Sequence, residues 1–165
     1  MLTCIRADGS VTWQASTPFF ALHDLYHLAV ESVLGYYQAF YGLLAAGREI
    51  DSFGTRNGEK DTYTAEEMWA ESIVGFLQWP EVGGGPPLSS TEVLQQLTST
   101  FQNSPYGVPP ITADQVQQIR RVASTLHTLW VDVAAGEQLE LPFPLTAQPY
   151  FTDDIYRATQ YTGAI

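Results

Sequence analysis

The alternation of apolar and polar residues at the start of the chain predicts a β-hairpin. Asp8-Gly9 is a preferred pair for a two-residue type I′ turn. Counting outward from this turn pairs Cys4 with Trp13 and Arg6 with Val11. One face of the hairpin is expected to lie on the core, and it carries Leu2, Cys4, Val11, Trp13 and Ala15.

Further along, four stretches show the three- and four-residue spacing of helices that pack on one face. Each begins with a residue whose side chain caps a helix by accepting a hydrogen bond from a first-turn amide. In three of them a Glu or Gln three residues later completes a capping box. The four N-cap residues are Thr17, Thr64, Ser89 and Thr112.

Glycine and proline predict where these helices end. Gly35 is expected to break the first, so that residues 36–46 form either a second, buried helix or a kinked continuation, which Gly47 ends. The third is expected to be stopped by Trp79-Pro80 and then by the run Gly83-Gly84-Gly85-Pro86-Pro87. The last helix is expected to run to Gly136, with an apolar seam formed by Val116, Ile119, Ala123, Leu126, Trp130 and Val133.

These elements together define the predicted fold class, which is α+β and predominantly α. Leu139, Leu141 and Phe143 alternate as in a strand, and Pro142 would place that strand at a sheet edge. We find no internal repeat and no long linker, and the tail from Tyr150 shows no clear period. Residues 1–165 are therefore expected to form a single domain: a bundle of four to five helices with an N-terminal hairpin and a small antiparallel sheet.

Composition narrows the classes of function. The chain has 18 acidic and 7 basic residues, a net charge of -11, which argues against binding nucleic acid or anionic lipid. There is no apolar run of about 18 residues to span a membrane, and the N-terminus lacks the pattern of a signal peptide. Cys4 is the single cysteine, which fits a reducing compartment. We therefore expect a cytoplasmic protein whose net charge keeps it in solution. The functional alternatives are that the charge attracts a cation or a basic partner protein.

The sharpest chemical signal is a pair of histidines. His23 and His27 lie four residues apart on the first helix and therefore share a face, which Glu31 extends by one further turn. Imidazole nitrogen and carboxylate oxygen are ligands for zinc, nickel, iron or manganese. At about 100° per residue, both histidines fall at the margin of the apolar face and Glu31 one step further toward solvent.

The third histidine, His127, lies at the margin of the last helix's seam. Helical bundles build metal sites from side chains on facing helices, and three ligands with one open position are typical of catalytic zinc. We therefore predict His23, His27 and His127 as ligands of a divalent metal. Glu31 would be a fourth ligand, a hydrogen-bond partner of a ligand, or a general base. The alternative is that the histidines are structural and satisfy backbone carbonyls or carboxylates.

His23-Asp24-x-x-His27 also resembles the HExxH helix of zinc proteases, with Asp24 in place of glutamate. That resemblance would take the third ligand from Glu67 or Glu71. The run from His23 to Glu31, followed by residues 35–47, looks like a group of small bacterial proteins of uncharacterised function. Three histidines on two helices are similar to the DinB-like helical-bundle metalloproteins, where the paired histidines come late. Here they come first, so no residue roles are carried over.

These observations lead to two hypotheses of different classes. The first is a metal-binding protein of hydrolase type, in which a metal-activated water attacks a small-molecule substrate. The second is a non-catalytic acidic module, such as an inhibitor or immunity-type partner of a basic protein. Metal retained by the purified protein would favour the first, and salt-sensitive binding to a basic partner the second.

Overall fold

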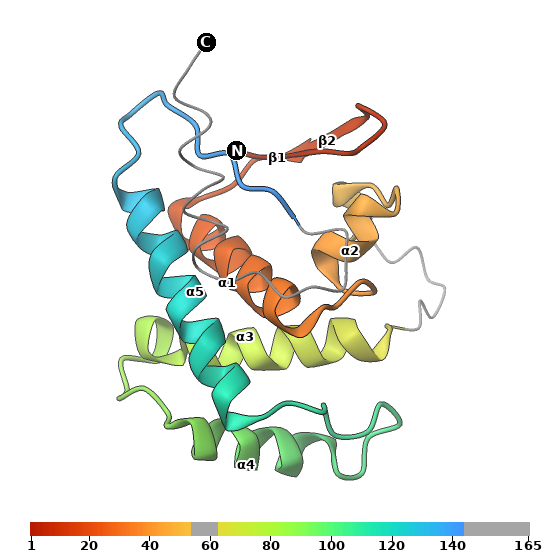
Figure 1. Cartoon of the computed structure of the whole chain (residues 1–165), viewed down its shortest axis with the longest axis vertical. Helices are drawn as coiled ribbons and strands as arrows, with labels where there is room; N and C mark the ends of the chain where they lie inside the picture. The colour runs from red at the N-terminus through yellow and green to blue at the C-terminus, as the bar shows by residue number, and fades with distance from the viewer. Residues whose placement is uncertain (54–62, 144–165) are drawn as a thin grey trace.

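The computed structural model describes residues 1–53 and 63–143 and confirms the predicted fold class (Figure 1). An N-terminal hairpin of two antiparallel strands precedes the helices. In chain order the elements are β1 (Leu2–Ile5), β2 (Val11–Gln14), α1 (Pro18–Leu34), α2 (Phe40–Ala45), the 3-10 helix η1 (Ile50–Phe53), α3 (Ala65–Gly83), α4 (Ser90–Phe101) and α5 (Ala113–Val131).

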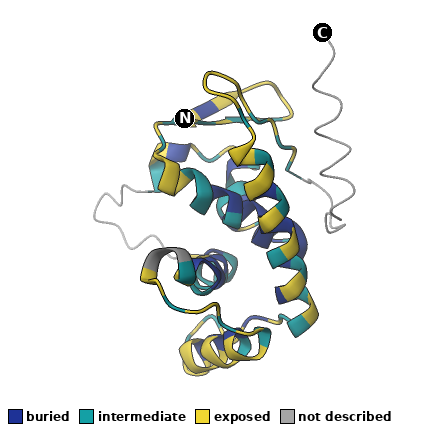
Figure 2. Ribbon diagram, turned by 90° about the vertical axis from the view of Figure 1, so that its left-hand side faces the viewer, coloured by how far each residue is buried: buried dark blue, intermediate teal, exposed yellow. Residues whose placement is uncertain are grey.

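Helix α1 is the centre of the molecule. It packs against α3, α5 and α2, while α4 lies below α3 and packs against α3 and α5 (Figure 1). Buried positions face inward between these helices and exposed ones line their outer sides (Figure 2). The fully buried apolar side chains that fill this core include Val30, Ile73, Val74, Val93, Leu97, Val116, Ile119 and Leu126.

The helix starts follow the sequence closely. All four predicted N-cap residues accept a hydrogen bond from a first-turn amide, and three of them form the predicted capping boxes. Gly35 ends α1 in the left-handed conformation (φ 67°), which costs glycine no steric strain. Of the two stops expected for α3, Trp79-Pro80 is wrong and the glycine run from Gly83 is confirmed. The helix continues through Pro80 and ends at Gly83, where the C-cap residue Gly84 takes the left-handed conformation (φ 67°).

The hairpin forms as predicted, but its register differs by one residue. Thr3 pairs with Trp13 and Cys4 with Thr12, so Val11 and Trp13 face solvent and Thr12 is buried. The cause is a three-residue loop. Gly9 donates to the Arg6 carbonyl at 2.9 Å and has a positive φ of 82°, as in a type I turn followed by a glycine bulge.

Two predictions at the C-terminal end need correction. Helix α5 ends at Val131, before Gly136. Residues 139–143 form no strand in the described structure, although Leu141 and Phe143 do pack against the core. The alternation there reflects an extended segment lying on helices, which leaves its backbone unpaired to a sheet. The tail from Tyr150 lies outside the described residues.

Arg6 connects the hairpin to the end of α2. Its guanidinium donates to the carbonyls of Leu44 and Arg48, both at 2.7 Å, and contacts Glu49 at 3.2 Å. A cation at the carboxyl end of a helix opposes the partial negative charge there and satisfies free carbonyls. The side chain is only 8% exposed, so it fixes the position of α2 relative to the hairpin. Among the described helices, none is long and apolar enough to cross a membrane.

Candidate metal centre

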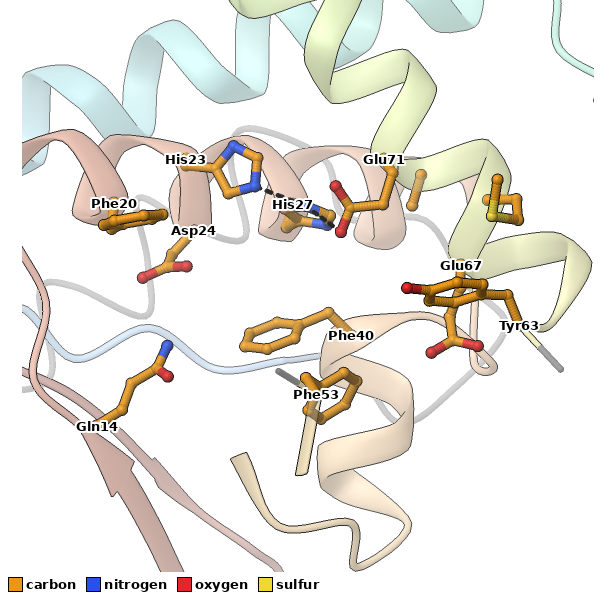
Figure 3. Close-up of a pocket in the computed structure, with 12 residues that line it drawn as sticks. Gln14, Phe20, His23, Asp24, His27, Phe40, Phe53, Tyr63, Glu67 and Glu71 are labelled. Carbon is orange, nitrogen blue, oxygen red and sulfur yellow. Dashed lines mark hydrogen bonds and ion pairs between the residues drawn. The ribbon is translucent and has the colours of Figure 1, made fainter. Parts of the chain in front are cut away.

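Two histidines of α1 and one glutamate of α3 point toward a common position (Figure 3). The Nε2 atoms of His23 and His27 are 3.2 Å apart, and Nε2 of His27 lies 3.5 Å from Oε1 of Glu71. All three atoms lie within 4.8 Å of one another. The group could therefore hold a metal ion.

The spacing fits a small divalent ion. Ligand atoms about 2.0–2.1 Å from a tetrahedral zinc lie roughly 3.3 Å from each other. Two of the separations here already match that value, and the third needs a modest closure of the Glu71 side chain, which is 60% exposed. The site thus needs little rearrangement to close on an ion.

The far nitrogen of each histidine also has an oxygen beside it. Nδ1 of His23 lies 3.0 Å from Oε1 of Gln78, and Nδ1 of His27 lies 3.4 Å from Oε1 of Glu31. An oxygen at Nδ1 favours the tautomer that carries its proton there and leaves Nε2 free for a metal. Gln78 is itself buried on α3, two turns after Glu71. The hydrogen bond with Gln78 therefore orients the ring of His23, and the carboxyl group of Glu31 faces Nδ1 of His27 as an ion-pair partner.

The helical projection placed Glu31 toward solvent, and this prediction is wrong. The side chain of Glu31 has no exposed surface. Its Oε2 accepts hydrogen bonds from the amides of Tyr41 at 2.8 Å and Gly42 at 3.3 Å. These are first-turn amides of α2, whose own N-cap, Ala39, provides no side-chain bond. The projection missed this because α1 is packed on more than one side, so its margin lies beneath α2.

The structure does not bring His127 into this group. Its side chain is exposed on α5, whereas His23 and His27 lie toward α3, and Glu71 supplies the third ligand atom. By the helical projection His127 lies roughly 80° from the centre of α5's buried face. A side chain at this angle from the buried face is exposed on α5, because α5 lies at the edge of the bundle. On α1, which lies at the centre, a side chain at a similar angle is covered by neighbouring elements. The third ligand is one that the HExxH-like alternative named.

A cavity of about 560 Å³ opens beside the three ligand atoms. Aromatic side chains from several elements form much of its wall, and the described lining residues include carboxylates but no lysine or arginine. Figure 3 shows these groups around the site. The lining residues are Gln14, Phe20, His23, Asp24, His27, Phe40, Phe53, Tyr63, Glu67, Met68, Ala70 and Glu71.

Asp24 is a second carboxylate on the wall of this cavity. It follows His23 directly and is 8% exposed, and its Oδ2 has no hydrogen-bond partner within the described structure. Burial raises the pKa of Asp24 to about 6, against a smaller opposing effect of His27. A carboxyl group in this state can exchange a proton near neutral pH.

The pKa values of the three candidate ligands are shifted by burial and by the charges of their neighbours. Burial lowers the pKa of His23. Burial also acts to lower the pKa of His27, but the carboxylates of Glu31 and Glu71 outweigh it and raise that pKa to about 9. The hydrogen bond from His27 holds the pKa of Glu71 below its ordinary value. The position between the three atoms therefore favours a positive charge, which a proton on His27 supplies when no metal is bound.

Comparisons with known proteins identify no relative. No protein-family model matches the chain, and no curated protein or solved structure matches it either. The resemblances noted from the sequence stay predictions. The function is therefore inferred from the geometry of the site.

Proposed function

We propose that this protein binds one divalent metal ion through His23, His27 and Glu71 and uses it in hydrolase-type chemistry. The observation that carries the proposal is the convergence of two Nε2 atoms and one carboxylate oxygen within 4.8 Å at the wall of a cavity. Two histidines and one carboxylate are a ligand set of catalytic zinc and of non-haem iron. Nickel and manganese accept the same donor atoms.

The cavity and Asp24 support a catalytic role over a structural one. Structural zinc sites have four protein ligands, whereas catalytic sites keep a position open. A bound divalent metal lowers the pKa of a coordinated water to about 7, which supplies a nucleophile at neutral pH. Asp24 would take the proton from that water. The aromatic walls and the lack of lysine or arginine among the lining residues favour a substrate with an apolar group and no negative charge.

Metal content is the direct test of the site. Protein purified without a histidine tag is analysed by elemental mass spectrometry, and metal-free protein is titrated with zinc by calorimetry. We expect one ion per chain in the wild type and loss of binding in His27→Ala and Glu71→Gln. The matched controls are His127→Ala and Glu140→Gln, at exposed positions outside the group. A wild type that binds no added metal, or equal affinity in all four variants, would end the proposal.

Asp24→Asn separates metal binding from catalysis. The amide keeps the shape of the side chain but cannot take a proton. We expect this variant to retain its metal. Its rate of hydrolysis of neutral aryl esters or amides is expected to fall by about 10²–10⁴-fold, the contribution of a general base. Full activity in Asp24→Asn would remove Asp24 from the mechanism, while the metal content decides the site itself. Binding of a basic partner protein stays a prediction from the net charge.

A further inference from the structure

Glu31 performs two tasks with one carboxylate, and they connect the metal site to a neighbouring helix. Oε1 faces Nδ1 of His27 at 3.4 Å, and Oε2 receives the amides of Tyr41 and Gly42. Glu31 lies on α1, and both amides belong to the first turn of α2. One fully buried side chain therefore contacts a metal ligand and caps the start of another helix.

Both tasks require an acceptor, which only a carboxylate offers on each of its two oxygens. Next to Nδ1 of His27, an acceptor keeps the ring proton on that nitrogen and leaves Nε2 free. Next to the two amides, an acceptor replaces the missing N-cap of α2. An amide at position 31 has one acceptor and one donor, so it satisfies one side and opposes the other.

Helix α2 in turn shapes the cavity. Its first residue, Phe40, lines the cavity and lies with its ring centre 5.9 Å from that of His27. Phe40 also packs on Phe53 of η1, with ring centres 4.9 Å apart. The position of the start of α2 therefore sets the aromatic wall beside the metal ligands.

We propose that Glu31 is a positioning residue that couples metal binding at His27 to the seating of α2. This inference rests on the proposed metal site. When the metal takes Nε2 of His27, the ring is fixed and Glu31 is held with it, which strengthens the cap on Tyr41 and Gly42. Coupling between two binding events is reciprocal, so an intact cap strengthens metal binding by the same factor.

Hydrogen exchange of wild-type protein tests the coupling without any substitution. The amides of Tyr41 and Gly42 are expected to exchange about 10–100-fold more slowly with zinc than without it, the range by which outer partners of metal ligands alter affinity. The control is the amide of Glu92, which Ser89 caps at the start of α4. Its exchange is expected to stay unchanged. Equal rates at Tyr41 and Gly42 in both forms would overturn the coupling.

Glu31→Gln tests the role of the carboxylate. We expect either a zinc affinity about 10–100-fold weaker or loss of protection at Tyr41 and Gly42. With the weaker affinity we expect His27, in metal-free protein at a pH above its pKa of about 9, to shift to the tautomer protonated on Nε2. Nitrogen-15 spectra of the imidazoles report the tautomer, which a purely structural change would leave alone. The matched control is Glu92→Gln, since Glu92 also accepts from a backbone amide at a helix start.

The outcomes separate the two proposals. Zinc bound by the wild type, with both affinity and amide protection intact in Glu31→Gln, would refute the coupling and leave the metal site standing. No zinc bound by the wild type would refute the metal site and the coupling with it. If Glu31→Gln does not fold, the exchange measurement on the wild type still decides.

Discussion

Replacing Gly42 by alanine tests how tightly α2 is packed, because alanine favours a helix while its Cβ atom would clash with the neighbouring backbone. A Cβ atom at this position would lie 2.3 Å from both the carbonyl carbon and the oxygen of Tyr37, where ordinary contacts begin at 3.4 Å. The obstacle is backbone, so no side-chain rotation relieves it. Gly42→Ala therefore requires α2 or the Tyr37 segment to move by about 1 Å, the difference between those two distances.

The cost follows from what that movement disturbs. Overpacking of a buried position costs about 1–3 kcal/mol. The hydrogen bond from Gly42 to Glu31 is already 3.3 Å long, and losing a bond to a charged group costs about 1.5–3 kcal/mol. Alanine recovers about 1 kcal/mol of helix propensity. We expect Gly42→Ala to lower the free energy of unfolding by about 2–4 kcal/mol.

Urea unfolding of a matched pair of variants measures this directly. Gly75 lies inside α3, and a Cβ there would meet nothing within 4 Å. Gly75→Ala is therefore expected to stabilise the protein by about 0.5–1 kcal/mol. The two substitutions are chemically identical and should change stability in opposite directions. A Gly42→Ala variant as stable as the wild type would refute the packing argument.

Three further predictions address the metal, the hairpin and a helix start. Zinc at 100 times its dissociation constant should stabilise the protein by about 2.7 kcal/mol, or about 5–11 °C in Tm, reversed by a chelator and absent in Glu71→Gln. Arg6→Lys should lower the free energy of unfolding in urea by about 1.5–3 kcal/mol, because a single ammonium cannot reach both the Leu44 and Arg48 carbonyls; an unchanged midpoint would contradict this. Hydrogen bonds from Ser89 hold the pKa of Glu92 below its ordinary value. The capping bond to ionised Glu92 therefore stabilises the folded protein fully at pH values above the ordinary glutamate pKa, and this contribution is lost as the pH falls through the lowered pKa. Ser89→Ala should raise the Glu92 pKa in an NMR titration, and no change would show that the capping box does not set it.

The helix starts were predictable because their causes are local. Thr17, Thr64, Ser89 and Thr112 each act on amides within three residues, so the sequence alone identifies them. The hairpin register was not predictable from the same local signals, because the choice between a two-residue and a three-residue loop depends on Asp8. Its carboxylate accepts from both the amide and the hydroxyl of Ser10 and stabilises the longer loop.

The candidate site was predictable only in its first half. His23 and His27 share a face by spacing alone, whereas the third ligand depends on which helix lies opposite them. Hydrophobic periodicity tells how a helix is oriented toward the core but not toward which neighbour, so His127 and Glu71 were equivalent at that level. The same limit hid the burial of Glu31, whose partners on α2 are set by tertiary packing.

Helix α2 has only six residues, and a helix of that length does not persist in water by itself. It exists because the carboxyl group of Glu31 on α1 accepts from an amide at its start and the guanidinium of Arg6 in the hairpin donates to a carbonyl at its end. A chain that began at Thr17 would lack Arg6 and would release that end. The consequence for protein engineering is that trimming or fusing partners to the first fifteen residues perturbs the cavity wall at Phe40, although Gln14 alone of those residues touches the cavity.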